Sequence, residues 1–116
     1  MKIIAVVQAR MGSKRLPNKV MQTINGVPMI ELLLNRLSMV SCIDQIILAT
    51  PSSASNSILN AHVRNLGYEV YNGSENDVLD RYYQAVKDKR PDAVIRITGD
   101  CPLIDPSLVN DIVKAF

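Results

Sequence analysis

The sequence has 116 residues, of which 47% are hydrophobic and 21% are charged. This length and composition indicate one soluble globular domain over residues 1–116, and they exclude an intrinsically disordered chain. The formal net charge of +2 is unevenly distributed, because residues 1–40 carry +5 and residues 41–116 carry −3. A total so close to zero gives no support to a nucleic-acid partner.

The sequence also disfavours a membrane protein and a zinc-binding protein. No apolar run approaches the ~20 residues that cross a bilayer, and the short apolar N-terminus runs directly into Gln8 and Arg10, unlike a signal peptide. Cys42 and Cys101 are far apart, and the chain has a single histidine. A zinc site and a disulfide are therefore both unexpected. We expect a cytoplasmic protein with no membrane partner.

Short β-branched apolar runs alternate with amphipathic helical patterns along the whole chain. In chain order we expect a strand over Lys2–Val7, a helix with Pro28 in its first turn, a strand over Gln45–Thr50, a helix capped by Ser52 or Ser53, a weaker strand over Glu69–Tyr71, a helix opened by Asn76 or Asp77, a strand over Ala93–Thr98 and a helix over Ser107–Ala115. This order, with right-handed crossovers, predicts a doubly wound three-layer α/β fold. Ligands of such sheets bind at the carboxyl ends of the strands.

The segment after the first predicted strand is strongly basic. Four cations lie between Arg10 and Lys19, with Gly12 and Ser13 among them and no acid. Glycine lets backbone N–H groups approach a phosphate, serine adds a hydroxyl donor, and arginine forms bidentate charge-assisted bonds. Neither the P-loop pattern nor the dinucleotide glycine pattern is present, and many charge runs are simply solvated loops. The position at a strand's carboxyl end favours phosphate binding.

A carboxylate follows the last predicted strand. Asp100 comes directly after Gly99, and a second acid, Asp105, precedes Pro106. Magnesium is commonly held by one or two carboxylates together with phosphate oxygens and water. Asp100, facing a phosphate-binding loop on a neighbouring strand, is the candidate ligand. Asp105 is predicted to cap the following helix instead.

Residues 9–19, 25–30 and 99–104 closely resemble the cytidylyltransferases that activate sugar acids, among them CMP-Kdo synthetase and acylneuraminate cytidylyltransferase. Residues 73–82 and 96–102 resemble signatures of the branch named spore coat polysaccharide biosynthesis protein F. The resemblance covers the whole chain. It implies the Rossmann-like three-layer fold of nucleotide-diphospho-sugar transferases, with four βα units and a mostly parallel sheet of strand order 3-2-1-4.

The resemblance also implies a reaction and a site. A sugar hydroxyl attacks the α-phosphorus of CTP, CMP is transferred, and pyrophosphate leaves with Mg²⁺. The matching positions for binding the nucleotide are Ala9, Arg10, Gly12, Ser13, Arg15, Lys19, Ser74 and Arg81, of which Ala9, Ser74 and Arg81 would contact cytidine. Arg10 and Lys19 are the expected catalytic cations, and Asp100 matches the magnesium-binding aspartate. The implied partners are CTP and a sugar acid or related sugar.

Other interpretations stay open. One alternative is a nucleotide-sugar glycosyltransferase of similar fold, although the sequence has no Asp-x-Asp metal motif. A second is a catalytically incomplete nucleotide-binding module. Family members are markedly longer, so we expect this chain to be the N-terminal half of a nucleotidyltransferase domain and to form homo-oligomers through its uncovered fourth strand. Gln8, Thr98 and Cys101 depart from the residues usual in CMP-Kdo synthetases, which leaves the acceptor sugar open.

Overall fold

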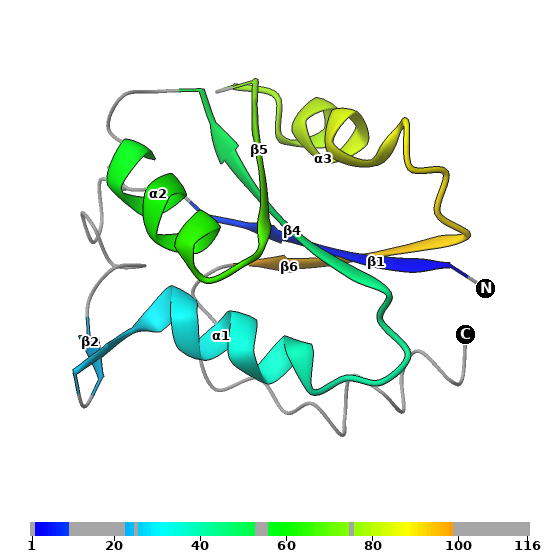
Figure 1. Cartoon of the computed structure of the whole chain (residues 1–116). Helices are drawn as coiled ribbons and strands as arrows, with labels where there is room; N and C mark the ends of the chain where they lie inside the picture. Colours follow the sequence, from blue (N-terminus) through cyan, green and yellow to red (C-terminus); the bar gives the residue numbers. More distant parts are fainter. Residues whose placement is uncertain (1, 10–22, 25, 53–55, 75, 99–116) are drawn as a thin grey trace.

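The computed structural model describes residues 2–9, 23–24, 26–52, 56–74 and 76–98. In chain order its elements are β1 (Ile3–Gln8), β2 (Thr23–Ile24), β3 (Val27–Pro28), α1 (Met29–Ser38), β4 (Gln45–Pro51), α2 (Ser57–Asn65), β5 (Glu69–Gly73), α3 (Val78–Val86) and β6 (Ala93–Thr98) (Figure 1). The helix predicted over residues 107–115 lies outside the described residues. None of the described helices is long and apolar enough to cross a membrane.

The main sheet is parallel and has the order β5-β4-β1-β6. When its four strands are numbered among themselves, this is the predicted order 3-2-1-4. The difference from the prediction is the additional antiparallel pair formed by β2 and β3 between β1 and α1. Gly26 closes the connection of this pair with φ of +83°, a backbone conformation that favours glycine.

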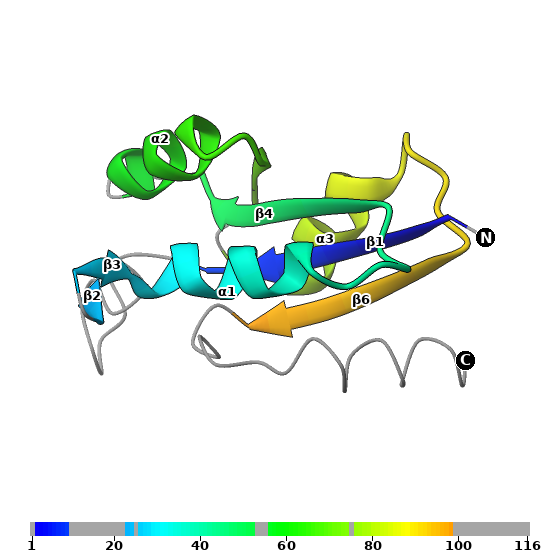
Figure 2. The same ribbon diagram turned by 60° about the horizontal axis from the view of Figure 1, so that its bottom comes forward.

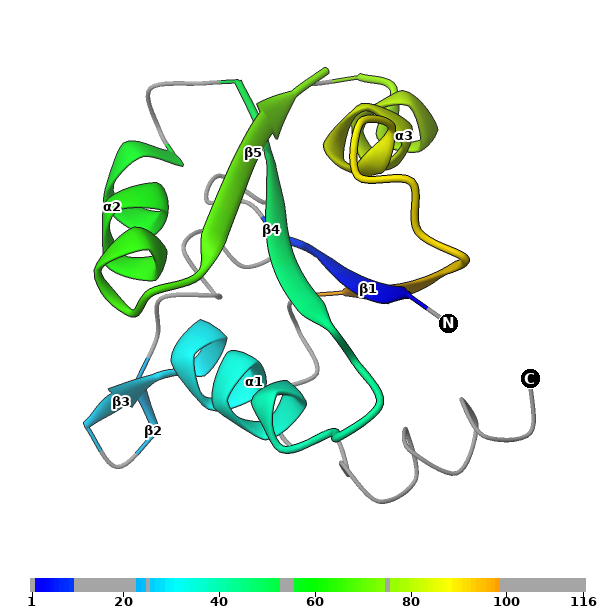
Figure 3. The ribbon, with the colours of Figure 1, turned by 45° about the vertical axis from the view of Figure 1, so that its right-hand side comes forward.

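The helices cover both faces of the sheet, which makes the predicted three layers. α1 and α2 lie on one face and α3 lies on the other (Figures 2 and 3). Val7 packs with the α1 and α2 side chains, whereas Ile4 and Val6 pack with those of α3. β1 is therefore buried on both faces, as its unbroken run of β-branched residues predicts.

The start of α2 differs from the prediction. The N-cap position is occupied by Asn56, not by Ser52 or Ser53. β4 continues to Pro51, and the Ser52 N–H donates to the Gly73 carbonyl at 2.9 Å. Ser52 thus still bonds to the end of β5 and does not begin the helix. Similarly, Pro28 is the N-cap residue of α1 and ends β3, so it precedes the first turn rather than lying in it.

Asp77 caps α3, as one of the two predicted alternatives. Its carboxylate accepts a hydrogen bond from the Asp80 N–H at 3.0 Å. We expect Asp77→Ala to lower the free energy of unfolding by about 1 kcal/mol, because an N–H of the first turn loses its acceptor. Urea denaturation measures this change. Asp77→Asn keeps an acceptor oxygen and should stay near wild type; equal losses in the two variants would contradict the capping role.

Candidate active site

The carboxyl ends of the four parallel strands meet at one edge of the sheet. Gln8 at the end of β1 is the register partner of Thr98 at the end of β6, and Pro51 of β4 is the partner of Gly73 of β5. The basic segment follows β1 and the Gly99–Asp100 segment follows β6, so the two begin on adjacent strands. The predicted site residues Arg10, Gly12, Ser13, Arg15, Lys19 and Asp100 themselves lie outside the described residues.

Ala9 occupies the last described position before the basic segment. Its side chain is 5% exposed and belongs to the core on the face of α1 and α2. The Ala9 N–H donates to the Ala49 carbonyl at 3.3 Å, which extends the pairing with β4 by one residue. Its methyl group and its N–H are therefore both used inside the fold.

Ser74 and Arg81 are brought together where β5 passes into α3. The Arg81 Nε–H donates to the Ser74 carbonyl at 2.9 Å, and the Ser74 hydroxyl oxygen accepts from the Asp77 N–H at 3.0 Å. The Arg81 side chain is only 1% exposed. A guanidinium removed from water requires hydrogen-bond partners, and a backbone carbonyl of the connection supplies one here. Arg81 therefore holds the connection from inside.

The chain approaches itself closely at Gly73, the residue before Ser74. A Cβ atom placed there would lie 2.7 Å from a ring carbon of Tyr71 and 3.0 Å from Cγ of Arg81. Only a residue without a side chain fits between these two groups. The end of β5, the Tyr71 ring and the Arg81 stem thus form one packed unit, which we call the β5–α3 junction (residues 71–81).

Sequence reasoning missed a second set of contacts at this edge. The Tyr82 hydroxyl donates to Oε1 of Gln8 at 3.3 Å, and the Arg96 guanidinium carbon lies 4.5 Å from the centroid of the Tyr82 ring. This cation–π contact orients an exposed positive charge on β6. The alternation of side chains along a strand could have revealed these contacts, because side chains two residues apart lie on the same face of a strand. Gln8 therefore shares a face with Val6, and Arg96 is the register partner of Val6.

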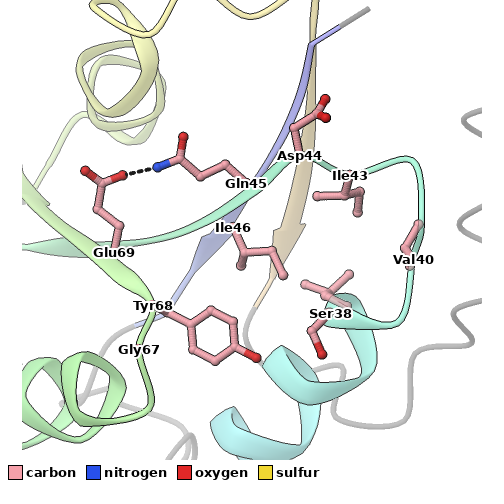
Figure 4. Close-up of a pocket in the computed structure, with 10 residues that line it drawn as sticks. Ser38, Val40, Ile43, Asp44, Gln45, Ile46, Gly67, Tyr68 and Glu69 are labelled. Carbon is pink, nitrogen blue, oxygen red and sulfur yellow. Dashed lines mark hydrogen bonds between the residues drawn. The ribbon is translucent and has the colours of Figure 1, made fainter.

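A hollow of about 350 Å³ lies at the opposite edge of the sheet. Gln45 and Glu69, the first residues of β4 and β5, line it together with Tyr68 and Ser38 (Figure 4). The Gln45 side-chain amide donates to the Glu69 carboxylate. The hollow is remote from the strand ends that precede the basic and Gly99–Asp100 segments, so it is not part of the candidate site.

Within the described residues no group of three or more histidine, cysteine, aspartate or glutamate side chains could hold a metal ion. A family model described as Cytidylyltransferase matches residues 4–116, nearly the whole chain. The chain belongs to the cytidylyltransferase family.

Individual members of the cytidylyltransferase family support this assignment. The spore coat polysaccharide biosynthesis protein SpsF of Bacillus subtilis is 35% identical over 97% of this chain and 49% of its own length. A cytidylyltransferase structure from Leptospira borgpetersenii has a TM-score of 0.94 and 33% identity, covering 100% of this chain and 49% of that one. The structure of CMP:2-keto-3-deoxy-manno-octonic acid synthetase complexed with CTP has a TM-score of 0.87 and 26% identity, covering 99% of this chain and 47% of that one.

The chain spans about half the length of the curated relatives that it matches. Of the residues predicted to contact cytidine, Ser74 and Arg81 touch each other in the β5–α3 junction. Ala9 lies at the end of β1, which β4 separates from β5 in the sheet. The described residues thus place the β1–β6 strand ends and the β5–α3 junction at the same edge of the sheet.

Proposed function

We propose that this chain forms the CTP-binding half of a nucleotidyltransferase that transfers CMP from CTP to a sugar acid or related sugar of surface-polysaccharide biosynthesis. The observation that carries the proposal is the cytidylyltransferase match over residues 4–116. The parallel pairing of β1 with β6 supports it, because the basic segment and the Asp100 segment start from neighbouring strand ends. A CTP complex of one related synthetase and the polysaccharide role named for the Bacillus relative support the substrate classes.

In the proposed reaction a hydroxyl oxygen of the sugar bonds to the α-phosphorus of CTP. The bond from that phosphorus to the oxygen bridging to the β-phosphate breaks, and pyrophosphate leaves. Enzymes accelerate such transfers mainly by positioning and by charge stabilisation. We assign Arg10, Arg15 and Lys19 to the triphosphate, with Arg10 and Lys19 balancing the charge that develops on the leaving group. Gly12 and Ser13 would contribute donors of the loop.

Asp100 is the residue that would hold Mg²⁺. A single carboxylate beside a triphosphate suits this ion, which takes its other oxygen ligands from phosphate and water. When bound, the ion would supply further neutralisation of the phosphate oxygens. The protein's part is to place the Asp100 segment beside the basic segment, and the register pairing of Gln8 with Thr98 favours this placement.

The cytidine end of the nucleotide is assigned to Ala9, Ser74 and Arg81. The Ser74 carbonyl accepts from Arg81 within the fold, so the β5–α3 junction is preorganised before a ligand arrives. Preorganised donors and acceptors bind a ligand with less loss of conformational entropy. Arg81 acts here as the support of the Ser74 backbone.

Calorimetric titration of the chain with CTP in the presence of Mg²⁺ tests the proposal. We expect binding by the wild type and a loss of about tenfold or more in affinity for Arg10→Ala and for Lys19→Ala, because a hydrogen bond to a charged group contributes about 1.5–3 kcal/mol. Lys87→Ala is the matched control, since this exposed cation is the C-cap residue of α3, on the side away from the strand ends. Equal losses in all three variants would point to general electrostatic attraction instead.

Pyrophosphate release separates the candidate reactions. Release that requires both CTP and a sugar acid supports cytidylyl transfer. CTP binding without release from any acceptor in a panel of sugar acids indicates a nucleotide-binding module. Turnover of a nucleotide sugar in place of CTP would indicate a glycosyltransferase.

A further inference from the structure

A small polar cluster joins three elements near the carboxyl ends of β4 and β5. We call it the amide cluster; its members are Thr50 of β4, Asn60 of α2 and Asn72 of β5. The Asn60 Nδ2–H donates to Oδ1 of Asn72 at 2.9 Å. Oγ1 of Thr50 lies 2.6 Å from Oδ1 of Asn72 and 3.0 Å from Oδ1 of Asn60, so its one proton can go to either amide oxygen.

Two of the three members of the amide cluster are buried, while Asn72 is exposed on β5. Thr50 is fully buried and Asn60 is 7% exposed, while the other buried side chains of α2 are Leu59 and Val63. A buried amide stabilises the fold only where its hydrogen bonds are made, and partial satisfaction is costly. An apolar residue at position 60 would avoid this requirement. The satisfied amide instead gives directional contacts that fix one arrangement of α2, β4 and β5.

These contacts act on the strand that leads into the β5–α3 junction. β5 is at the end of the strand order and has β4 as its ladder neighbour. Asn72 is the register partner of Thr50, and the next pair is Gly73 with Pro51. Edge positions with few partners open locally at low free energy. The amide cluster adds side-chain hydrogen bonds at Asn72, the residue that directly precedes Gly73 and Ser74.

We propose that Asn60 is a positioning residue for the nucleotide site. Through Asn72 it holds the carboxyl end of β5, and hence the Ser74 backbone, where cytidine is bound. Asn60 itself lies on the α1–α2 face of the sheet, and its side-chain hydrogen bonds go to Thr50 and Asn72, neither of which is a predicted ligand-binding residue. The inference rests on the proposed function, which assigns Ser74 to the cytidine end of CTP.

Asn60→Ala tests the proposal against Asn65→Ala, which removes an exposed amide from the same helix. CTP titrations are run at a temperature well below the midpoint of thermal unfolding of each variant. We expect Asn60→Ala to weaken CTP binding by about tenfold, the range seen for residues that act through others. We also expect faster amide exchange at Ser52, whose N–H donates to the Gly73 carbonyl. The Asn65 variant should match wild type in both measurements.

Thr50→Val and Thr50→Ser form a second pair if the Asn60 variant does not fold. Valine keeps the shape and removes the hydroxyl, whereas serine keeps the hydroxyl, so weaker CTP binding is expected for valine alone. Unchanged CTP affinity and unchanged Ser52 exchange in folded Asn60→Ala or Thr50→Val would overturn the proposal, even if the midpoint of thermal unfolding fell.

A wild-type chain that does not bind CTP contradicts the proposed function. The rate of amide exchange at Ser52 then decides separately whether Asn60 holds β5.

Discussion

Replacing Arg81 by alanine should lower the free energy of unfolding by about 3–5 kcal/mol, the range for large buried side chains. Arg81 is among the largest fully buried side chains of the described residues, at 1% exposure. The substitution leaves a cavity beside Gly73 and removes the bond from Nε to the Ser74 carbonyl. The Ser74 carbonyl then no longer has Arg81 as its hydrogen-bond donor, which lowers the free energy of unfolding further. Urea denaturation monitored by circular dichroism measures the change.

Two variants control for the Arg81 effect. Arg64→Ala removes an exposed arginine from α2, and surface changes of this kind stay within about 0.5 kcal/mol of wild type. Arg81→Lys keeps the charge and most of the stem but loses the Nε–H donor, so an intermediate loss is expected. If Arg81→Ala unfolded at the same urea concentration as Arg64→Ala, Arg81 would not be the support of the β5–α3 junction. CTP affinity should fall with Arg81→Ala and not with Arg64→Ala.

The sequence could predict most strands of the main sheet because apolar β-branched runs leave a strong pattern, even in β6, where Val94 and Arg96 are exposed. β1, β4 and β6 are runs of β-branched and small apolar residues, and each was predicted within one residue of its bounds. β5 has polar residues at Glu69 and Asn72, and its exposed positions dilute the apolar pattern. The prediction there was weaker and stopped two residues early, at Tyr71.

Local chemistry alone could not predict two features of the fold. β2 and β3 have two residues each, too few to show any period. At the predicted cap Ser52, the backbone N–H instead donates to the Gly73 carbonyl of β5. Asn56 then lies at the N-cap position and its side chain donates to the Pro51 carbonyl at 3.0 Å. The Ser52–Gly73 contact joins segments that are far apart in the sequence, so no local pattern reveals it.

In the candidate site, too, some features follow from local sequence patterns and others depend on tertiary contacts. Parallel topology predicts that the segments after β1 and β6 start side by side, since right-handed crossovers fix which strands are neighbours. Helical periodicity, in contrast, assigns polar residues of α2 and α3 to solvent. Asn60 and Arg81 break that rule, at 7% and 1% exposure. Their partners, Asn72 and the Ser74 carbonyl, come from β5 and the connection after it, so no pattern within one helix reveals them.

Gly73→Ala should lower the free energy of unfolding by about 1–3 kcal/mol, as for other insertions into packed sites. The new Cβ atom would lie 2.7 Å from a ring carbon of Tyr71 and 3.0 Å from Cγ of Arg81, so one of these groups has to move. Tyr71 is held in the core on the α3 face and Arg81 is bonded to Ser74. Either movement displaces Ser74, and CTP affinity should fall together with stability.

Gly67→Ala separates this steric effect from a general cost of replacing glycine. A Cβ at Gly67 meets nothing within 4 Å, but φ is +96°, so alanine there is strained by its backbone alone. Gly67→Ala should therefore lose stability and keep CTP affinity, whereas Gly73→Ala loses both. Tyr71→Leu in the Gly73→Ala background removes the ring that the new methyl group meets, and part of both losses should return. A Gly73→Ala chain with wild-type stability and CTP affinity would show that the junction adapts freely and does not position Ser74.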